Sequence, residues 1–418
     1  MKVSRFGRKI AESSGISRLM DDLGNALAAG GDICMLGGGN PAHIPEVQQC
    51  FRESMLRLLE NDRQFERTIG NYDPPQGNRE FIEAVAALLR HEFGWDIKAK
   101  NIALTNGSQS AFFILFNIFA GAFEGGANKK ILLPLAPEYI GYSDIGLAED
   151  LFMANRPEIE HLDDHTFKYH VNFDQLRITD EIGAICVSRP TNPTGNVLTD
   201  SEIEKLSEIA CANNIPLIID NAYGTPFPNI IFTDARPHWN DNTILCMSLS
   251  KLGLPATRTG IVVANEEVIA LICEMNAITS LAPGGIGAAM ALDLVHSGRI
   301  ISLSREVIRP FYQTRANEAV EQLCNELDGI DFHIHKPEGA IFLWLWFRGI
   351  PITNVELYER LKKRGVLIVP GHYFFPGLKQ EWKHKDECIR LNYSQDKKAV
   401  AAGLKILADE VKLAYQGA

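Results

Sequence analysis

Residues 183–224 read GAICVSRPTNPTGNVLTDSEIEKLSEIACANNIPLIIDNAYG: an apolar run, a helix-like segment and a second apolar run. The apolar runs 183–190 and 216–222 are short and rich in Ile, Val and Leu, which is typical of strands buried on both faces of a parallel sheet. Residues 200–214, between them, carry apolar side chains at helical spacing, with an Asp-Ser start and an Asn-Asn end. The order strand, helix, strand predicts an α/β domain with a mainly parallel sheet.

The same alternation continues on both sides of this stretch. Further apolar runs of strand length are NIALTNG (101–107), KILLPLA (130–136), TILCMSLS (243–250) and TGIVVAN (259–265). Ligands of such sheets bind at the carboxyl ends of the strands. Because polar residues directly follow several of these runs, we expect those residues to converge on one edge of the sheet.

The last third of the chain has a different pattern. A long helical stretch from about residue 300 is followed by an apolar run, a helix, a second apolar run and a final helix. We therefore expect three parts: an N-terminal segment (1–50) that packs on the small domain, a large domain (51–298), and a small α+β domain (299–418).

Charge and composition exclude several classes of protein. A net charge of −11 and the lack of a Lys- or Arg-rich run do not suit a nucleic-acid-binding surface. The longest apolar-rich stretches, 111–123 and 341–347, are shorter than the ~20 residues that span a bilayer, and residues 1–15 lack the apolar core of a secretory signal. We expect a cytoplasmic protein with no membrane or nucleic-acid partner. The scattered Cys residues predict reduced thiols, and HIH (333–335) favours a strand over a metal site.

The strongest chemical signal is SLSKLGLPATRTG (248–260), in which Lys251 directly follows a predicted strand. A lysine there forms an imine with an aldehyde if burial or a nearby cation lowers its pKa. The hydroxyls of Ser248 and Ser250, together with Arg258, could hold a phosphate group. The alternative is a solvated lysine at a strand end.

Two further segments place polar groups after strands. In IIDNAYG (218–224), Asp220 could pair with a protonated pyridine nitrogen or merely cap a helix, and Tyr223 could reach a phenolic oxygen on the same ring. In SRPTNPTGNVLT (188–199), Asn192 could donate its amide to a ligand oxygen, or the prolines could simply shape a turn.

LTNGSQSAFFILF (104–116) passes from a strand through Asn-Gly-Ser into an apolar helix. Its first N–H groups and the helix dipole could bind a phosphate group, although an ordinary N-cap by Ser108 explains the same residues. Taken together, these segments offer one ligand an amine for its aldehyde, an acid for its ring nitrogen, donors for its phenolate and a site for its phosphate.

With NPTG at 192–195, SLSK at 248–251 and RTG at 258–260, in this order, the chain resembles the fold-type I, class I/II aminotransferases, which depend on pyridoxal phosphate. GGGNP, NYDPPQG, PEGAIFLW, VPG and CIRLNY also resemble landmarks of that family, across nearly the whole chain. The resemblance implies a large domain with a mainly parallel seven-stranded sheet flanked by helices, and a smaller α+β domain.

The resemblance also implies roles for individual residues. Lys251 would hold pyridoxal 5'-phosphate, Asp220 would pair with its ring nitrogen, and Asn192 and Tyr223 would donate to its phenolic oxygen. The other implied cofactor contacts are Gly107, Ser108, Gln109, Ser248, Ser250 and Arg258 at the phosphate, Tyr139 stacked on the ring, and Tyr72 reaching the phosphate of a neighbouring subunit in a homodimer. Arg390, Gly39 and Asn192 would bind the substrate carboxylate. The spacing from Lys251 to Arg258 is one residue shorter than is common in the family, with Pro255 inside it.

Stretches such as LGGGNPA, CVSRPTNPTGNV and KPEGAIFLWLWF are similar to those of family members that act on valine and pyruvate. The expected reaction therefore moves an amino group between L-valine or L-alanine and a 2-oxo acid by a ping-pong mechanism. Two alternatives remain. One is another enzyme of the same fold, such as a C–S lyase, and the other is a regulatory sensor, which would need a basic DNA-binding domain ahead of residue 37.

Overall fold

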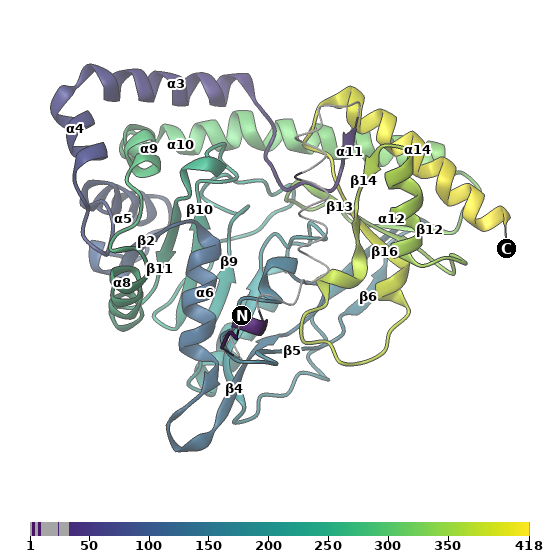
Figure 1. The fold of residues 1–418 in the computed structure, drawn as a ribbon, viewed down its shortest axis with the longest axis horizontal. Coiled ribbons are helices and arrows are strands. Elements are labelled where there is room, and N and C mark those ends of the chain that lie inside the picture. The colour runs from purple at the N-terminus through teal and green to yellow at the C-terminus, as the bar shows by residue number, and fades with distance from the viewer. Residues whose placement is uncertain (1, 5–6, 10–23, 25–32, 418) are drawn as a thin grey trace.

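The large sheet lies at the centre of the molecule, between two groups of helices (Figure 1). The computed structural model describes residues 2–4, 7–9, 24 and 33–417. In the order β2-β11-β10-β9-β8-β4-β3, with β5 beside β4, the sheet has eight strands. They are β2 (Ile102–Thr105), β3 (Gly121–Ala122), β4 (Asn128–Leu133), β5 (Phe152–Ala154), β8 (Ile182–Ser188), β9 (Leu217–Asp220), β10 (Thr243–Ser248) and β11 (Gly260–Val263). All six predicted strands are present, and the predicted α/β class is confirmed.

The pairing of this sheet is mainly parallel. β8 is parallel to both β4 and β9, and β9 is parallel to β10. β11 runs antiparallel to β10 and to β2. The expected count of seven strands is exceeded because the two-residue β3 pairs antiparallel with β4. A strand of two residues leaves no apolar run in the sequence from which it could be predicted.

Helices cover both faces of the sheet, which is why its strands are buried on both faces. The helices that contact it are α5 (Arg79–Phe93), α6 (Ser108–Phe119), α7 (Asp200–Ala212) and α8 (Glu266–Ser280). Outside them, α3 (Pro45–Glu60), α4 (Asp62–Gly70) and α9 (Ile286–His296) pack mainly on other helices. The short turns are η1 (Ala99–Asn101), η2 (Glu124–Gly126), η3 (Ile140–Tyr142) and η4 (Pro255–Thr257). α7 matches the predicted helix, and Thr199 and Glu202 form a capping box at its start.

A second sheet of six strands has the order β15-β16-β13-β12-β7-β6. It consists of β6 (Glu158–His161), β7 (Thr166–His170), β12 (Phe332–His335), β13 (Phe342–Phe347), β15 (Val369–Pro370) and β16 (Cys388–Asn392). The helical elements around it are α10 (Arg299–Ser302), the π-helical η5 (Leu303–Ile308), α11 (Arg309–Glu326), α12 (Asn354–Lys363), η6 (Gly371–Phe374), α13 (His384–Glu387) and α14 (Lys397–Gln416). The segment HIH lies in β12, so the predicted strand is confirmed.

The second sheet contains strands from both sides of residue 298. β6 and β7 precede residue 298 in the chain, yet β7 pairs with β12. Near the N-terminus, β1 (Cys34–Met35) pairs with β14 (Val366–Leu367), which ties the described end of the first segment to the last third of the chain. Most of residues 1–32 lie outside the described residues, and the division into 1–50, 51–298 and 299–418 stays a prediction.

No single helix among the described residues is both long and apolar enough to cross a membrane. α9 and the segment Arg299–Glu326 together reach that length and composition, but they meet at a bend of 93°. Within the described ranges, no cluster of three or more His, Cys, Asp or Glu side chains could hold a metal ion. The cytoplasmic location expected from the sequence stays a prediction.

A buried ion pair between Lys168 and Glu338 joins the second sheet to the loop that follows β8. Both side chains are at most 7% exposed. Lys168 Nζ also donates to Asn196 Oδ1 and to the Val197 carbonyl, each at 3.0 Å. The Val197 N–H donates to Glu338 Oε2 at 3.1 Å. This network holds the loop at residues 191–197 in place, and Asn192 is part of that loop.

We expect Glu338→Gln to lower the free energy of unfolding by about 3–5 kcal/mol, because Lys168 would remain buried without a charged partner. The matched control is Glu83→Gln, which breaks the exposed pair between Arg79 and Glu83 and should change stability far less, because water screens both charges. Urea denaturation of the two variants and the parent chain measures both changes. Equal changes would contradict the assignment of Lys168 and Glu338 as a stabilising buried pair.

Candidate active site

One cavity of about 510 Å³ opens where β8, β9 and β10 end, beside the start of α6. Its walls also include the loop at residues 37–40 and Arg390 of β16. Segments from both sheets therefore meet there, as expected at the carboxyl ends of parallel strands. Its volume lies within the range of small-molecule sites, which is roughly 300–1,000 Å³.

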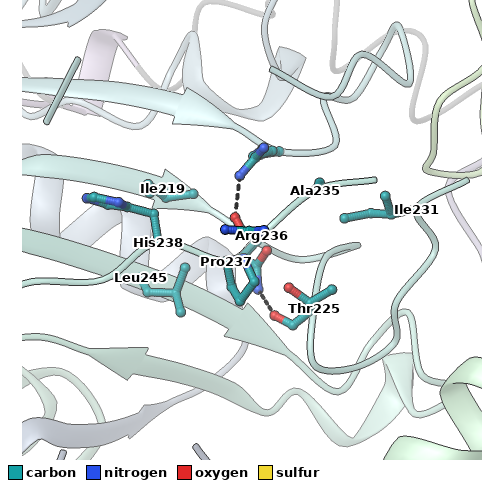
Figure 2. Close-up of a pocket in the computed structure, with 10 residues that line it drawn as sticks. Ile219, Thr225, Ile231, Ala235, Arg236, Pro237, His238 and Leu245 are labelled. Atoms are coloured by element: carbon teal, nitrogen blue, oxygen red, sulfur yellow. Dashed lines mark hydrogen bonds between the residues drawn. The ribbon is translucent and has the colours of Figure 1, made fainter. Parts of the chain in front are cut away.

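Figure 2 shows a much smaller hollow, of about 10 Å³, which has Ile219 and Leu245 among its lining residues. Side chains alternate along a strand, so Ile219 faces this hollow while Asp220 faces the large cavity. The hollow has room for about one water molecule and is too small for an organic ligand.

Arg189 lies at the small hollow and anchors the start of the loop that contains Asn192. Its guanidinium donates to the Arg236 carbonyl at 2.7 Å, to the Leu198 carbonyl at 2.7 Å and to Asp200 Oδ1 at 2.6 Å. With three acceptors at hydrogen-bonding distance, this side chain fixes the loop on the side away from the cavity.

Lys251 lies in the turn directly after β10, and its amine points into the large cavity. Nζ donates to the Gly39 carbonyl at 2.6 Å and lies 5.4 Å from the centroid of the Tyr223 ring. Burial of the amine lowers its pKa to about 8, helped by the positive charges of Arg390 and Arg258 and opposed by Asp220. At pH 7 roughly a tenth of this amine is therefore unprotonated and nucleophilic, far more than for a lysine with an ordinary pKa.

Asp220 is the last residue of β9 and contributes a carboxyl group to the cavity. Its Oδ1 accepts the Ala222 N–H at 3.0 Å, and its Oδ2 accepts the Tyr142 hydroxyl at 2.9 Å. Burial raises the pKa of Asp220 to about 6, while these hydrogen bonds and the Lys251 charge oppose the rise. At pH 7 the group is thus mainly ionised and suited to a cationic partner.

Arg390 lies in β16, across the cavity from the large sheet. It donates to Asn192 Oδ1 at 2.8 Å and to the Gly37 carbonyl at 2.6 Å, and its guanidinium lies 4.1 Å from the Phe342 ring centroid. Its Nε is buried and has no hydrogen-bond partner among the described residues. Because Asn192 accepts through its oxygen, its amide N–H groups are left to donate.

The N-terminus of α6 and Arg258 form a site suited to an anion. The first-turn N–H groups of a helix, here those of Ser108 and Gln109, have no partner within the helix. Arg258 Nη1 lies 3.4 Å from Ser250 Oγ and 3.2 Å from the Pro255 carbonyl. The short loop with Pro255 therefore still brings Arg258 to the cavity, with Arg258 itself at a φ of 49°.

Gly107, directly before α6, leaves the space in which the Arg258 guanidinium lies. Its φ is +85°, and a Cβ atom built at this position would overlap that guanidinium. Tyr139 has a comparable relation with Gly141, where a Cβ atom would overlap the Tyr139 ring. Gln109 Nε2 donates to the Gly141 carbonyl at 2.9 Å and so links the Tyr139 segment to α6.

The structure brings together in this cavity nearly all of the site residues predicted from sequence. Those that line it are Gly39, Ser108, Gln109, Tyr139, Asn192, Asp220, Tyr223, Ser248, Ser250, Lys251, Arg258 and Arg390. Gly107 lies behind Arg258 instead, and the Tyr72 side chain is 82% exposed, away from the lining of this cavity.

Three other polar residues were not predicted: Glu138, Tyr142 and Ser188. Tyr142 donates to Asp220, and Ser188 hydrogen-bonds with Glu138. The available signal was the position of Glu138 and Tyr142 on either side of Tyr139 in PEYIGY. That signal is weak, because nothing in the sequence indicates that Glu138 and Tyr142 lie near Asp220, which is far away along the chain.

The polar groups fit pyridoxal phosphate. Lys251 offers an amine for the aldehyde, Asp220 an acid for the ring nitrogen, and Arg258 with the start of α6 a site for the phosphate group. A further observation supports the phosphate site: Gly107 has no side chain, and this leaves the space in which the Arg258 guanidinium lies.

Comparisons with known proteins agree with this chemistry. Residues 47–407 match the family model for aminotransferase class I and II. The chain is 55% identical to a valine–pyruvate aminotransferase of Escherichia coli, with 99% of each chain covered. The crystal structure of a putative amino-acid aminotransferase from Psychrobacter arcticum has a TM-score of 0.97 and 49% identity, with 100% of both chains covered. That of a valine-pyruvate aminotransferase from Salmonella typhimurium has a TM-score of 0.89 and 53% identity, covering 97% of this chain and 100% of the other.

We expect Gly107→Ala to weaken the affinity for pyridoxal phosphate by roughly 10- to 100-fold, because the new methyl group displaces Arg258 and removes a charge-assisted contact. Gly94→Ala is the matched control, since Gly94 also has a positive φ (+69°) but nothing lies near its missing Cβ. Fluorescence titration of the apoprotein with the cofactor measures both affinities. A similar loss in both variants would point to backbone strain alone and would refute the role of Gly107.

Proposed function

The chain belongs to the class I and II aminotransferases, and on that premise we propose that it catalyses L-valine + pyruvate = 3-methyl-2-oxobutanoate + L-alanine. The cofactor is pyridoxal phosphate, and the two half-reactions follow a ping-pong order. The observation that carries the proposal is that Lys251, Asp220 and Arg390 line one cavity. The 55% identity with the Escherichia coli valine–pyruvate aminotransferase supports this choice of substrates.

When bound, pyridoxal phosphate supplies an aldehyde that takes up the amino group and a ring that accepts the electrons of the broken Cα–H bond. Lys251 would hold this aldehyde through its amine. Once free, its Nζ atom would be the base that accepts the proton of the substrate Cα. The lowered pKa of Lys251, about 8, supports this role because the amine needs to be unprotonated to accept a proton.

Asp220, Tyr223 and Asn192 hold the cofactor ring. The Asp220 carboxylate keeps the ring nitrogen protonated by pairing with it. Burial holds the pKa of Tyr223 well above its usual value, so its hydroxyl stays protonated and can donate to the phenolic oxygen. The Asn192 amide donates to the same oxygen, and Tyr139 stacks on the ring.

Arg258, the hydroxyls of Ser248 and Ser250, and the N-terminus of α6 would hold the phosphate group. Ser108 and Gln109 supply first-turn N–H groups, with the positive end of the helix dipole behind them. Gly107 leaves room for Arg258. This arrangement anchors the cofactor at the end opposite to the substrate.

Arg390 and Asn192 bind the α-carboxylate of the substrate. A guanidinium presents two parallel N–H groups to a carboxylate, and burial of Arg390 strengthens the pairing. The unpartnered Nε atom of Arg390 supports this role, because it leaves a donor free for a ligand. Gly39 lines the same cavity, and its backbone N–H would donate to the same carboxylate.

The lining of the cavity favours amino acids with small apolar side chains. Among the described lining residues, the cations are Lys251, Arg258 and Arg390, and each already has a role. No further Lys or Arg of the described residues lines the cavity to pair with a side-chain carboxylate, whereas Ile140 and Val369 offer apolar surface. Valine and alanine fit this lining better than aspartate or glutamate.

We expect L-valine and L-alanine to convert the loaded protein to its aminated cofactor form, with the absorbance change at least ~10-fold faster than with L-aspartate. The described lining offers no further cation for the second carboxylate of L-aspartate. Stopped-flow spectroscopy of single half-reactions measures these rates. Lys251→Ala is the control and should show no conversion with any amino acid. If valine and alanine are inert while another amino acid reacts, the proposed substrates are wrong. Release of ammonia or thiol would indicate the lyase alternative.

The proposal includes a homodimer in which each subunit contributes to the other's site. Large apolar side chains are exposed on the large domain, namely Leu56, Leu59, Ile69, Tyr72, Ile278, Leu281 and Ile286. The Gly284 N–H donates to Asn106 Oδ1 at 2.9 Å, so this surface adjoins the segment at the start of α6. An exposed apolar surface of this kind is typical of an interface between subunits. Tyr72 would reach the phosphate group of the partner's cofactor.

Mixed dimers test whether Tyr72 acts across the interface. Lys251→Ala subunits are inactive, and Tyr72→Ala subunits should bind the cofactor weakly. If Tyr72 acts on the neighbouring site, a dimer with one subunit of each kind contains one complete site, and coexpression should restore activity well above either variant alone. If Tyr72 acts within its own subunit, no complete site forms and activity stays low. A variant pair that sediments as monomers would refute the dimer.

A further inference from the structure

A second carboxyl group, that of Glu138, is buried behind Asp220. The side chain is 1% exposed. Its Oε1 accepts the Ser188 N–H at 2.8 Å, its Oε2 accepts the Tyr139 N–H at 3.2 Å, and Ser188 Oγ lies 2.6 Å from Oε2. Glu138 is thus fully hydrogen-bonded, although it does not contact the cavity.

The surroundings of Glu138 favour its neutral form. The groups that influence its charge are Ser188, Tyr139 and Asp220, and none is a cation. Tyr142 and Cys186, which interact electrostatically with it, are also acids rather than bases. A buried carboxylate without a cation is costly, so burial raises the pKa of Glu138 to about 8.

Two hydroxyl groups connect Glu138 to Asp220. Ser188 Oγ lies 2.6 Å from Glu138 Oε2 and 3.5 Å from the Tyr142 hydroxyl, which donates to Asp220 Oδ2 at 2.9 Å. Ser188 and Tyr142 are at most 2% exposed. The link between Ser188 and Tyr142 is the longest of the three and therefore the weakest.

The two carboxyl groups differ in what each can pair with. Asp220 faces Lys251 and the cofactor ring, whereas Glu138 faces only hydroxyl and amide groups. Two coupled carboxyl groups share their charge unequally, so the negative charge belongs on Asp220 and the proton on Glu138. With Glu138 protonated, every hydroxyl can donate in the same direction: from Glu138 to Ser188, then to Tyr142, then to Asp220. Aligned hydrogen bonds of this kind strengthen one another.

We propose that neutral Glu138, Ser188 and Tyr142 form a hydrogen-bond relay that keeps the Asp220 carboxylate ionised and oriented toward the ring nitrogen of the cofactor. Glu138 and Tyr142 are positioning residues, because they do not line the cavity and act through Asp220. Ser188 also lines the cavity, so the Tyr142→Phe variant decides the test. The proposal rests on the proposed function only in requiring that pyridoxal phosphate bind at Asp220, and it is independent of which amino acid reacts.

The first test is the affinity of the apoprotein for pyridoxal 5'-phosphate at pH 7, measured by fluorescence titration. Tyr142→Phe removes the donor to Asp220 and should weaken binding roughly 10- to 100-fold. Ser188→Ala interrupts the relay one step earlier and should weaken binding about 3- to 10-fold. Glu138→Gln should stay within about tenfold of the parent protein, because the amide can donate to Ser188 Oγ and accept from the Ser188 N–H as a protonated carboxyl does, and it loses only the 3.2 Å contact with the Tyr139 N–H.

Matched controls separate the relay from general effects of losing a buried hydroxyl. Tyr393→Phe removes a buried hydroxyl that donates to the Ala340 carbonyl, and Ser304→Ala removes one that donates to the Ile300 carbonyl. Neither residue lines the cavity, so both variants should bind the cofactor within about twofold of the parent protein. Circular dichroism of each apoprotein checks that the variants are folded.

The second test detects the proton on Glu138 directly. Infrared difference spectra at pH 7 between the parent protein and Glu138→Gln should contain the carbonyl band of a protonated carboxylic acid. Because the pKa of Glu138 is raised to about 8, the group is protonated below that pH, and the band should disappear as the pH rises through it. This readout requires neither substrate nor turnover.

Two results would overturn the relay. The first is Tyr142→Phe and Ser188→Ala variants that bind the cofactor as tightly as their controls. The second is a Glu138→Gln variant that changes affinity more than tenfold at pH 7 with no carboxylic acid band, since Glu138 would then be ionised. If valine and alanine prove inert while the affinity pattern holds, the proposed substrates fail and the relay stands.

Discussion

The active-site cavity depends on charges that are held partly or wholly out of water. Among the lining residues that the structure describes, Lys251, Arg258 and Arg390 face a single carboxylate, that of Asp220. Removal from water lowers the pKa of Lys251 and raises that of Asp220, which leaves an amine that can react and an acid that prefers a cationic partner. An anionic cofactor and a substrate carboxylate would compensate the excess of positive charge. Because a buried carboxylate needs hydrogen-bond donors, Tyr142, which donates to Asp220, is also part of the site.

The rigidity of the surrounding loops follows from buried polar contacts. The Asn192 loop is held on one side by Arg189 and on the other by the buried pair of Lys168 and Glu338. Arg390 reaches across from the second sheet to the Asn192 oxygen. Because the site is assembled between two sheets, its geometry depends on how those sheets pack and not on any single element.

Much of the fold and of the site was accessible from the sequence. Strands such as β8 and β9 are continuous apolar runs, and that pattern alone predicts a buried parallel sheet. Asp220 and Lys251 could be chosen because each directly follows such a run, where parallel strands present their ends together. The order of the NPTG, SLSK and RTG segments then indicated the cofactor through the family resemblance. The short β3 left no such pattern.

Contacts between distant segments were decided only by the tertiary structure. The sequence placed Glu138 and Tyr142 beside Tyr139 but contained nothing that joined them to Ser188 or Asp220, because hydrogen bonds between loops leave no periodic pattern. The sequence also did not show which backbone atoms of residues 37–39 would bind Lys251 and Arg390. Packing of the second sheet against the first placed the Gly39 carbonyl at Lys251 and the Gly37 carbonyl at Arg390. A buried strand leaves a local apolar pattern that can be read from the sequence. The hydrogen-bond partners across the cavity come from distant segments, so they depend on how the two sheets pack together.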